Sequence, residues 1–194
     1  ATTPANQVFC NNQIAPITNI SGTGTSYSWT NSNPAIGLAA SGTGNIPSFT
    51  AINSGFGPVT ATISITPHFL NNGVECLGTS VSYTITINPT PIVNDPANQT
   101  VCNGSLTSAV AFQGYTGTIY NWTNTMPSIG LAASGTGDIA AFTGQNSGTS
   151  PLVGTIQVTP QYLYAGLSCY GTAETFTITV NPSPVVDFSA QNQV

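Results

Sequence analysis

Few side chains in this sequence are suited to acid–base or nucleophilic chemistry. The chain of 194 residues has one histidine, His68, no lysine and no arginine, and its formal net charge is −5. A Ser-His-Asp or Cys-His arrangement would depend on His68, and glycoside hydrolysis needs two acids roughly 5–10 Å apart in a cleft. The five acids are scattered along the chain, at Glu75, Asp95, Asp138, Glu174 and Asp187. We therefore predict that the protein is not an enzyme and uses no cofactor.

Calcium is the metal that these acids would suit best. A calcium site takes six to eight oxygen ligands, several of them from carboxylates. Asp138 in "GTGDI" and Asp95 in "NDP" can each supply one, but a second copy of the first motif reads "GTGNI", with Asn45 in place of the acid. We interpret both aspartates as turn-forming residues and predict no metal site.

The glycine-rich motif "IGLAASGTG" occurs twice, at Ile36–Gly44 and at Ile129–Gly137. A phosphate-binding loop of the Walker type needs a lysine after its glycines and a strand-to-helix context, and the motif has neither. It is typical of a turn between strands. We predict that Ile36 and Leu38 enter the core, and that four glycines supply positive φ angles at the turn: Gly42, Gly44, Gly135 and Gly137.

The chain as a whole is two copies of one unit. The equivalent pairs are Cys10 and Cys102, Trp29 and Trp122, Pro67 and Pro160, and Cys76 and Cys169. Residues 29–67 and 122–160 share 24 identities in 39 positions. A repeated active site would recur in both copies, yet Gln161 replaces His68 and Ser168 replaces Glu75. The repeat therefore outweighs any single motif as a guide to function.

Apolar residues alternate with polar ones in each copy. Val59, Ala61, Ile63 and Ile65 alternate with threonine and serine, and residues 81–88 repeat the pattern with Val81, Tyr83, Ile85 and Ile87. A period of two indicates strands with one buried face. Several short strands in about 93 residues indicate a β-sandwich of immunoglobulin size. Trp29 and Trp122, each two residues after a tyrosine, are expected in the core.

We therefore expect an all-β chain with two tandem immunoglobulin-like antiparallel β-sandwich domains, at residues 1–90 and 91–183. The proline-bearing segments Asn88–Gln99 and Asn181–Gln193 are interpreted as linkers. Residues 184–194 would lead into a further repeat, because "NQV" at Asn192–Val194 matches the residues that stand before Cys10 and Cys102.

The four cysteines lack the CxxC spacing of zinc and redox motifs, and their even number indicates two disulfides in an oxidising compartment. Four cysteines allow three pairings. Because the unit repeats, we predict the pairing that closes within each copy, Cys10–Cys76 and Cys102–Cys169.

Partners are limited by the charge and the hydropathy of the chain. Without cationic side chains it cannot neutralise nucleic-acid phosphates or anionic lipids, so we expect neither partner. No apolar run is long enough for a membrane helix. Three tyrosines near Gly166 form a candidate ligand contact that the first copy lacks: Tyr162, Tyr164 and Tyr170.

Three sets of residues carry a family likeness: "YSWTN" with "YNWTN", the shared glycine-rich block that ends in "NSG", and the endings "YTITINPTP" and "FTITVNPSP". They resemble the PKD-like repeats of very large secreted surface proteins of Bacteroidota, which include gliding and adhesion proteins. The resemblance implies a PKD-like, immunoglobulin-like sandwich, export to the cell surface by a type IX-like route, and no catalytic residues.

Three functions remain open from the sequence. The first is a stalk or structural segment of a cell-surface adhesin, such as a gliding-motility adhesin, whose partners are neighbouring repeats. The second is a module that binds carbohydrate, surface polysaccharide or another substratum through the tyrosines. The third is a subunit of a self-assembling filament.

Overall fold

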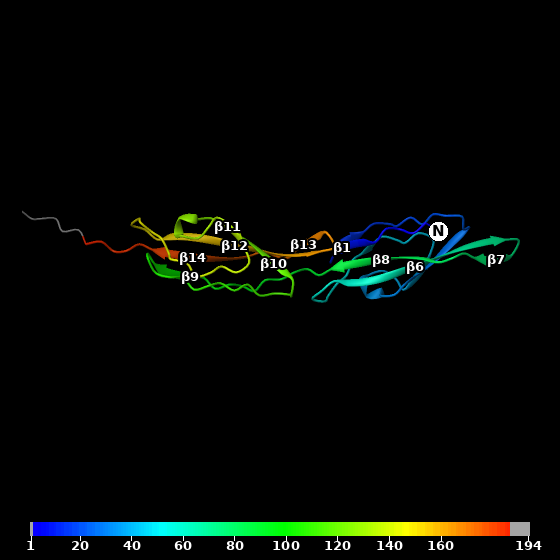
Figure 1. The fold of residues 1–194 in the computed structure, drawn as a ribbon, viewed down its shortest axis with the longest axis horizontal. Coiled ribbons are helices and arrows are strands. Elements are labelled where there is room, and N and C mark those ends of the chain that lie inside the picture. Colours follow the sequence, from blue (N-terminus) through cyan, green and yellow to red (C-terminus); the bar gives the residue numbers. More distant parts are fainter. Residues whose placement is uncertain (1, 187–194) are drawn as a thin grey trace, which may run out of the picture. The chain divides into compact units, whose positions relative to one another are not determined.

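The computed structural model describes residues 2–186, and these residues form strands joined by turns (Figure 1). The strands of the first repeat are β1 Gln7–Cys10, β2 Ile14–Ala15, β3 Ser26–Asn31, β4 Ser41–Thr43, β5 Phe49–Thr50, β6 Val59–Asn71, β7 Val74–Leu77 and β8 Val81–Asn88. Those of the second are β9 Gln99–Cys102, β10 Thr118–Asn124, β11 Ser134–Thr136, β12 Leu152–Tyr164, β13 Leu167–Tyr170 and β14 Glu174–Asn181. Single 3₁₀ turns lie at Pro34–Ile36 and Pro127–Ile129.

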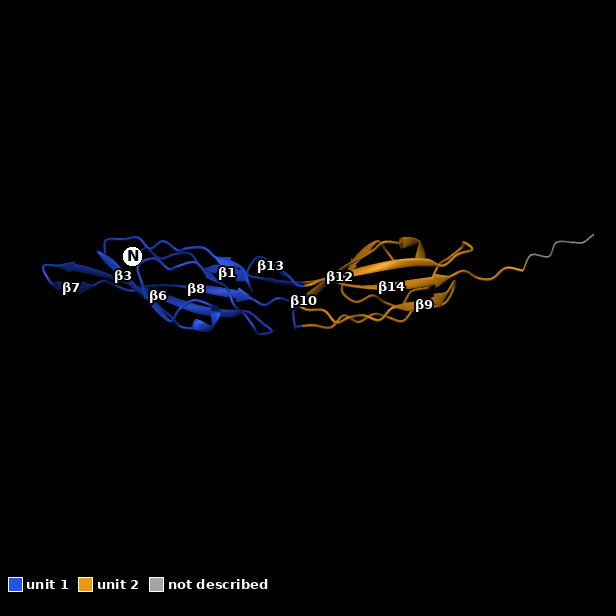
Figure 2. Cartoon of the chain, turned by 180° about the vertical axis from the view of Figure 1, so that it is seen from behind, with its two compact units in different colours: residues 1–91, 115–118, 161–171 blue, residues 92–114, 119–160, 172–194 orange. Residues whose placement is uncertain are grey.

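Two compact units divide these strands, and their limits do not follow the repeats (Figure 2). Unit 1 consists of residues 1–91, 115–118 and 161–171. Unit 2 consists of residues 92–114, 119–160 and 172–194. The hairpin formed by the end of β12 and by β13 is therefore part of unit 1, although its sequence belongs to the second repeat.

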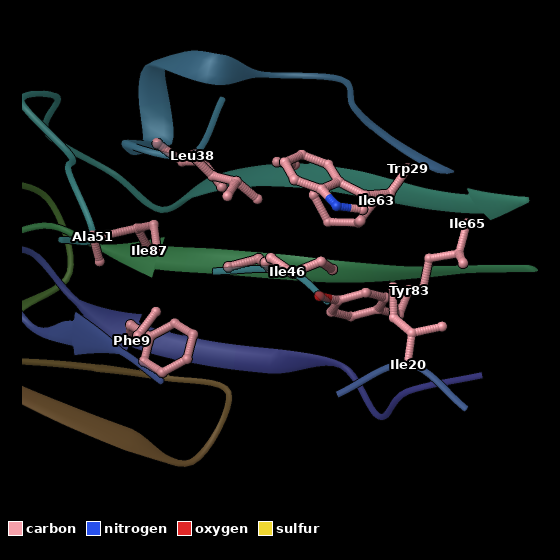
Figure 3. Close-up of a cluster of buried hydrophobic side chains, with 14 residues drawn as sticks. Phe9, Ile20, Trp29, Leu38, Ile46, Ala51, Ile63, Ile65, Tyr83 and Ile87 are labelled. Carbon is pink, nitrogen blue, oxygen red and sulfur yellow. The ribbon is translucent and has the colours of Figure 1, made fainter. Parts of the chain in front are cut away.

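Unit 1 has one large sheet with the strand order β1-β8-β6-β3-β4, and β7 pairs with the far end of β6. The short pair β2–β5 forms a second sheet. Residues from outside the large sheet, such as Ile20, Leu38 and Ile46, cover its inner face and complete the second layer of the sandwich (Figure 3). Unit 2 repeats the arrangement with the strand order β11-β10-β12-β14-β9.

The alternating residues of the sequence build the core as predicted. Ala61, Ile63 and Ile65 of β6 are fully buried. Ile65 pairs with Trp29 of β3 and Ile63 with Tyr83 of β8, and these four residues belong to one core cluster (Figure 3). In unit 2 the equivalent residues of β12 and β14 are also buried, including Ile156, Val158, Phe176 and Ile178. The predicted all-β fold with two immunoglobulin-like β-sandwich domains is confirmed.

One pair of strands in each unit runs in parallel, whereas the sequence pattern predicted antiparallel sheets. β1 pairs with β8 in parallel, and β9 pairs with β14 in the same way. About 70 residues separate the members of each pair, which is long enough for the crossover that parallel pairing needs. The first strand of each repeat therefore completes one edge of the sheet beside the last strand.

The glycines of the repeated motif have two different roles. Gly44 and Gly137 have φ near +72°, as predicted for a turn. Gly42 and Gly135 were wrongly assigned to the same role, because they lie in strands β4 and β11 directly opposite Trp29 and Trp122. A Cβ atom at either position would overlap the indole ring. These two glycines therefore make room for a tryptophan across the strand pair.

The segment Asn88–Gln99 contains the limit between the two units, at residues 91 and 92. From residue 92 onwards the segment is bound to unit 2, since the backbone N–H of Asn94 donates to the carbonyl of Gln113 at 2.9 Å. Most of the predicted linker at 184–194, including the "NQV" that would open a further repeat, lies outside the described residues.

Candidate functional site

His68 lies on β6 and forms a chain of polar contacts with two other side chains. Its Nε2 atom is 2.7 Å from the hydroxyl oxygen of Ser28 on β3, and its Nδ1 atom is 2.8 Å from a carboxylate oxygen of Glu75 on β7. The order hydroxyl, imidazole, carboxylate is that of a nucleophilic triad. No sequence motif indicates this arrangement, because the three residues meet only through the register of three strands.

The surroundings of Ser28 do not complete a catalytic site. Acyl transfer needs donors, usually backbone N–H groups, that point at the developing oxyanion. Ser28 lies in the middle of a sheet, where β3 pairs with Thr43 of β4 on one side and with Thr66 of β6 on the other. The backbone groups near its hydroxyl are therefore engaged in the sheet. In the second repeat Gln161 and Ser168 form the equivalent contact, at 2.9 Å, without an ionisable group.

Asp138 contacts a residue 26 positions earlier in the sequence, so its role as a turn-forming residue stays a prediction. Its carboxylate accepts the backbone N–H of Phe112 at 2.9 Å, and in the first repeat Asn45 accepts the N–H of Ile20 at the same distance. A neutral side chain in one repeat and a charged one in the other thus accept an equivalent backbone N–H. Within residues 2–186 no three His, Cys, Asp or Glu residues are grouped closely enough to hold a metal ion.

Buried asparagines are the polar residues that both repeats share. Asn53 donates to the carbonyls of Gly57 and Ile87 at 2.9 and 2.7 Å and accepts the N–H of Gly55. Asn146 makes the equivalent three bonds in the second repeat. Asn31 and Asn124 form a second such pair, and each binds two carbonyls of the glycine-rich motif. The signal for them was present in the identical "WTN" and "NSG" segments, but its structural meaning was missed.

The disulfide of the structure joins Cys10 to Cys169, so it links the first repeat to the second. Their Cα atoms are 5.6 Å apart, and 159 positions separate them in the sequence. Cys76 and Cys102 are free and exposed. The predicted pairing Cys10–Cys76 and Cys102–Cys169 is therefore wrong.

The length of β6 explains why Cys10 cannot reach Cys76. Cys10 lies beside Asn88 at the end of β8, next to the position where Val59 begins β6. Cys76 lies opposite Phe69, ten residues further along β6. Ten residues of strand span roughly 33 Å, whereas a disulfide needs Cα atoms within about 7 Å.

The hairpin that carries Cys169 also carries the three candidate tyrosines. Tyr162 is directly opposite Cys169, while Tyr170 is opposite Gln161. Because neighbouring residues of a strand point to opposite faces, Tyr162 and Tyr164 share the face of Cys169, and Tyr170 lies on the other face. The structure thus brings two of the three tyrosines to one face, and a ligand for them stays a prediction.

Contacts within unit 1 hold this face of the hairpin. The side-chain amide of Asn88 donates to the carbonyl of Tyr164 at 3.3 Å, and Tyr162 lies close to Gly117. Cys169 is only 2% exposed. The site that the structure builds is therefore a covalent attachment between repeats, and a disulfide of this kind is typical of an oxidising compartment.

Within the described part of the chain, no helix is both long and apolar enough to cross a membrane.

No curated protein matches the chain significantly. Solved structures with similar arrangements share little sequence with it. Human protocadherin-24 EC1-2 has 12% identity and a TM-score of 0.35, with 81% of this chain and 83% of that chain covered. Mouse cadherin-23 EC22-24 has 11% identity and a TM-score of 0.38, with 93% and 64% covered. The tandem Ig repeats of Dlar have 12% identity and a TM-score of 0.30, with 93% and 97% covered.

A family model gives a more specific result than these structures. Residues 7–91 match the model of the PKD-like domain. This range runs from the first residue of β1 to residue 91, where the first segment of unit 1 ends, and it includes Trp29, Gly42 and the buried Asn31 and Asn53. Residues 7–91 are therefore similar to the PKD-like domain, and the chain as a whole has an immunoglobulin-like all-β fold.

Proposed function

We propose that the protein is a non-catalytic structural segment of a cell-surface adhesin, and that a disulfide of this segment transmits the tension between the cell and the surface that the adhesin binds. The disulfide between Cys10 of the first repeat and Cys169 of the second is the observation that carries this proposal. It connects two points 159 positions apart in sequence by one covalent bond. A role in gliding motility and a location outside the cell belong to the same proposal.

The bond changes the path that a pulling force takes. When the chain is held at its two ends, the force passes from Cys10 directly to Cys169, and residues 11–168 are outside its path. Even if every strand separated, those residues would add no length. In the reduced chain the same 159 positions would release roughly 550 Å at about 3.3–3.6 Å per residue. The disulfide therefore limits how far this segment can extend under force, as a stalk under tension requires.

The repeated features support a structural role as well. The two repeats share the tryptophan opposite a glycine and the buried asparagines, all of which stabilise the sandwich. The ionisable group His68, by contrast, is replaced by Gln161 in the second repeat. Selection for a site would be expected to keep the reacting groups in both copies, whereas selection for a stable repeated unit keeps the core.

Single-molecule pulling between the two ends of the chain tests the proposal. We expect the oxidised chain to extend only by its segments outside the loop, and the reduced chain to extend by roughly 550 Å more, from its 159 additional positions. Cys169→Ser should behave like the reduced protein, and Cys76→Ser, which removes a free thiol, should behave like the oxidised one. Equal extension of the oxidised and reduced chains would refute the claim that the disulfide limits extension.

Two further assays separate the proposed function from its alternatives. A fluorophosphonate probe should not label Ser28, because oxyanion donors are usually free backbone N–H groups and the strand of Ser28 is paired on both sides. Labelling that requires His68 would reveal a hydrolase. On a glycan array the chain should not bind, whereas binding that is lost in Tyr164→Ala but kept in Tyr170→Ala would favour a carbohydrate-binding module.

A further inference from the structure

We propose that Cys102 of one chain and Cys76 of a second copy form a disulfide, so that copies join head to tail through the same contact that Cys10 and Cys169 make within one chain. The proposal does not depend on the adhesive function, because it concerns a covalent bond that can be measured on the purified protein. It rests on the two free cysteines, whose surroundings form two half-sites, and on the Cys10–Cys169 bond, in which the same two kinds of half-site are already joined.

The first half-site is the strand end at Cys102, which reproduces the strand end at Cys10. Cys10 pairs with Asn88 in the parallel β1–β8 ladder, and Cys102 pairs with Asn181 in the parallel β9–β14 ladder. The next residue then donates its N–H to that asparagine's carbonyl, at 2.9 Å in the first repeat and 2.8 Å in the second. Both cysteine carbonyls also accept an N–H from three residues on, at 3.0 Å. The backbone therefore presents both cysteines in the same way.

The second half-site is the β6–β7 hairpin, which reproduces the β12–β13 hairpin. Cys76 is opposite Phe69, as Cys169 is opposite Tyr162. Each hairpin turns through two residues with positive φ, the second of them a glycine: Asn72 and Gly73 in one, Ala165 and Gly166 in the other. The register and the turn together place both cysteines at the same point of the hairpin and on the same face.

The burial of side chains in the two hairpins, β6–β7 and β12–β13, indicates which face of a hairpin docks. In the β12–β13 hairpin the face of Cys169 is covered except near the turn: Cys169 is buried and Tyr162 and Leu167 are partly buried, whereas Tyr164 is exposed. In the β6–β7 hairpin the same face is open, with Phe69 50% and Val74 65% exposed beside the exposed Cys76. The opposite face is exposed in both hairpins, as Leu70 and Leu163 show. The open apolar face of the first hairpin is thus the one that its counterpart buries against unit 1.

A second copy of this chain is the occupant that fits. The strand end at Cys102 has the same backbone as the strand end at Cys10, which already binds the β12–β13 hairpin. The β6–β7 hairpin has the same backbone as the β12–β13 hairpin. Within one chain the side-chain amide of Asn88 donates to the carbonyl of Tyr164. Asn181 is the equivalent of Asn88, and Asn71 of the second copy is the equivalent of Tyr164. The same hydrogen bond can therefore form between two copies. Such a contact joins two different surfaces, so each added copy leaves one of each free for the next.

Formation of the bond needs a two-electron oxidant, for which a small-molecule disulfide such as oxidised glutathione is sufficient. The thiolate of one cysteine attacks the oxidant and forms a mixed disulfide, which releases one glutathione thiol. The thiolate of the second cysteine then attacks the mixed disulfide. One protein S–S bond replaces two S–H bonds, and two glutathione thiols carry away the electrons and the protons.

Oxidation of the purified chain with a glutathione buffer, followed by non-reducing electrophoresis and peptide mapping, tests the proposal. We expect a ladder of multimers joined by Cys76–Cys102, with Cys10–Cys169 intact in every band. Cys76→Ser and Cys102→Ser should each abolish the ladder. A mixture of these two variants should give a dimer and nothing larger, because each contributes one of the two half-sites.

A matched control tests whether docking, and not random collision, directs the bond. The double variant Cys102→Ser, Thr100→Cys carries an exposed thiol two residues earlier on the same strand and the same face. We expect its bond to Cys76 of a second chain to form at least ten times more slowly than the bond from Cys102. Equal rates, symmetric Cys76–Cys76 and Cys102–Cys102 bonds in similar amounts, or no multimers at all would overturn the proposal.

Discussion

The contact between Trp29 and Gly42 gives a sharp test of the fold, with the substitution Gly42→Ala. The two residues lie directly opposite each other on β3 and β4, and Trp29 is almost completely buried. A Cβ atom at Gly42 would overlap two atoms of the indole ring and lie 3.0 Å from a third. Since the strand ladder fixes both backbones, either the ring must leave its place or β4 must move away from β3.

The size of the effect follows from two opposing contributions. Overpacking of a filled core costs typically 1–3 kcal/mol, and the smaller freedom of alanine in the unfolded chain offsets about 0.4–1 kcal/mol. We therefore expect Gly42→Ala to lower the free energy of unfolding of unit 1 by about 1–2 kcal/mol. Gly44→Ala also destabilises, but for a different reason: its φ of +72° is strained for alanine, and no atom lies within 4 Å of the added group.

Hydrogen exchange measured peptide by peptide over a urea series gives the stability of unit 1 without a tryptophan signal. The deciding measurement is a double-mutant cycle with Trp29→Leu, which removes the overlapped ring atoms. The cost of Gly42→Ala should shrink by about 1–2 kcal/mol in that background, whereas Gly44→Ala should be additive within about 0.5 kcal/mol. If Gly42→Ala were also additive, or cost nothing alone, the assigned role of Gly42 would be refuted.

Three further predictions concern unit 1. Asn53→Ala should destabilise it by about 1–3 kcal/mol, because the buried carbonyl of Ile87 loses its donor; urea unfolding measures the loss. Cys169→Ser should lower its stability by up to about 5 kcal/mol in the chain-entropy model, since 159 positions lie in the loop, whereas Cys76→Ser should leave it unchanged. Burial raises the pKa of the Tyr83 hydroxyl above 10.0. The unfolded chain therefore loses that proton first, so the stability of unit 1 should fall as the pH rises above about 10, and Tyr83→Phe should remove this contribution.

The sequence alone determined the repeated β-sandwich, because its signals are local or periodic. Alternation with a period of two decides which face of a strand is buried, and residues such as Ile63 and Ile85 meet in the core whatever the loops do. The identity of the two copies then transfers each assignment from one to the other. The positive φ of Gly44 and Gly137 was predictable for the same reason, since a turn depends on few neighbouring residues.

The tertiary structure decided every feature that depends on register or on which strand ends meet. The sequence places Cys10 and Cys76 in one repeat, but the length of β6 separates them, and the bond forms instead to Cys169 in the next repeat. Gly42 is glycine because of a ring on the neighbouring strand, and Ser28, His68 and Glu75 meet across three strands. Periodicity defines the faces of a strand, whereas the partner of each residue is fixed only when the strands are aligned, which is why the repeat could be read from the sequence and the link between repeats could not.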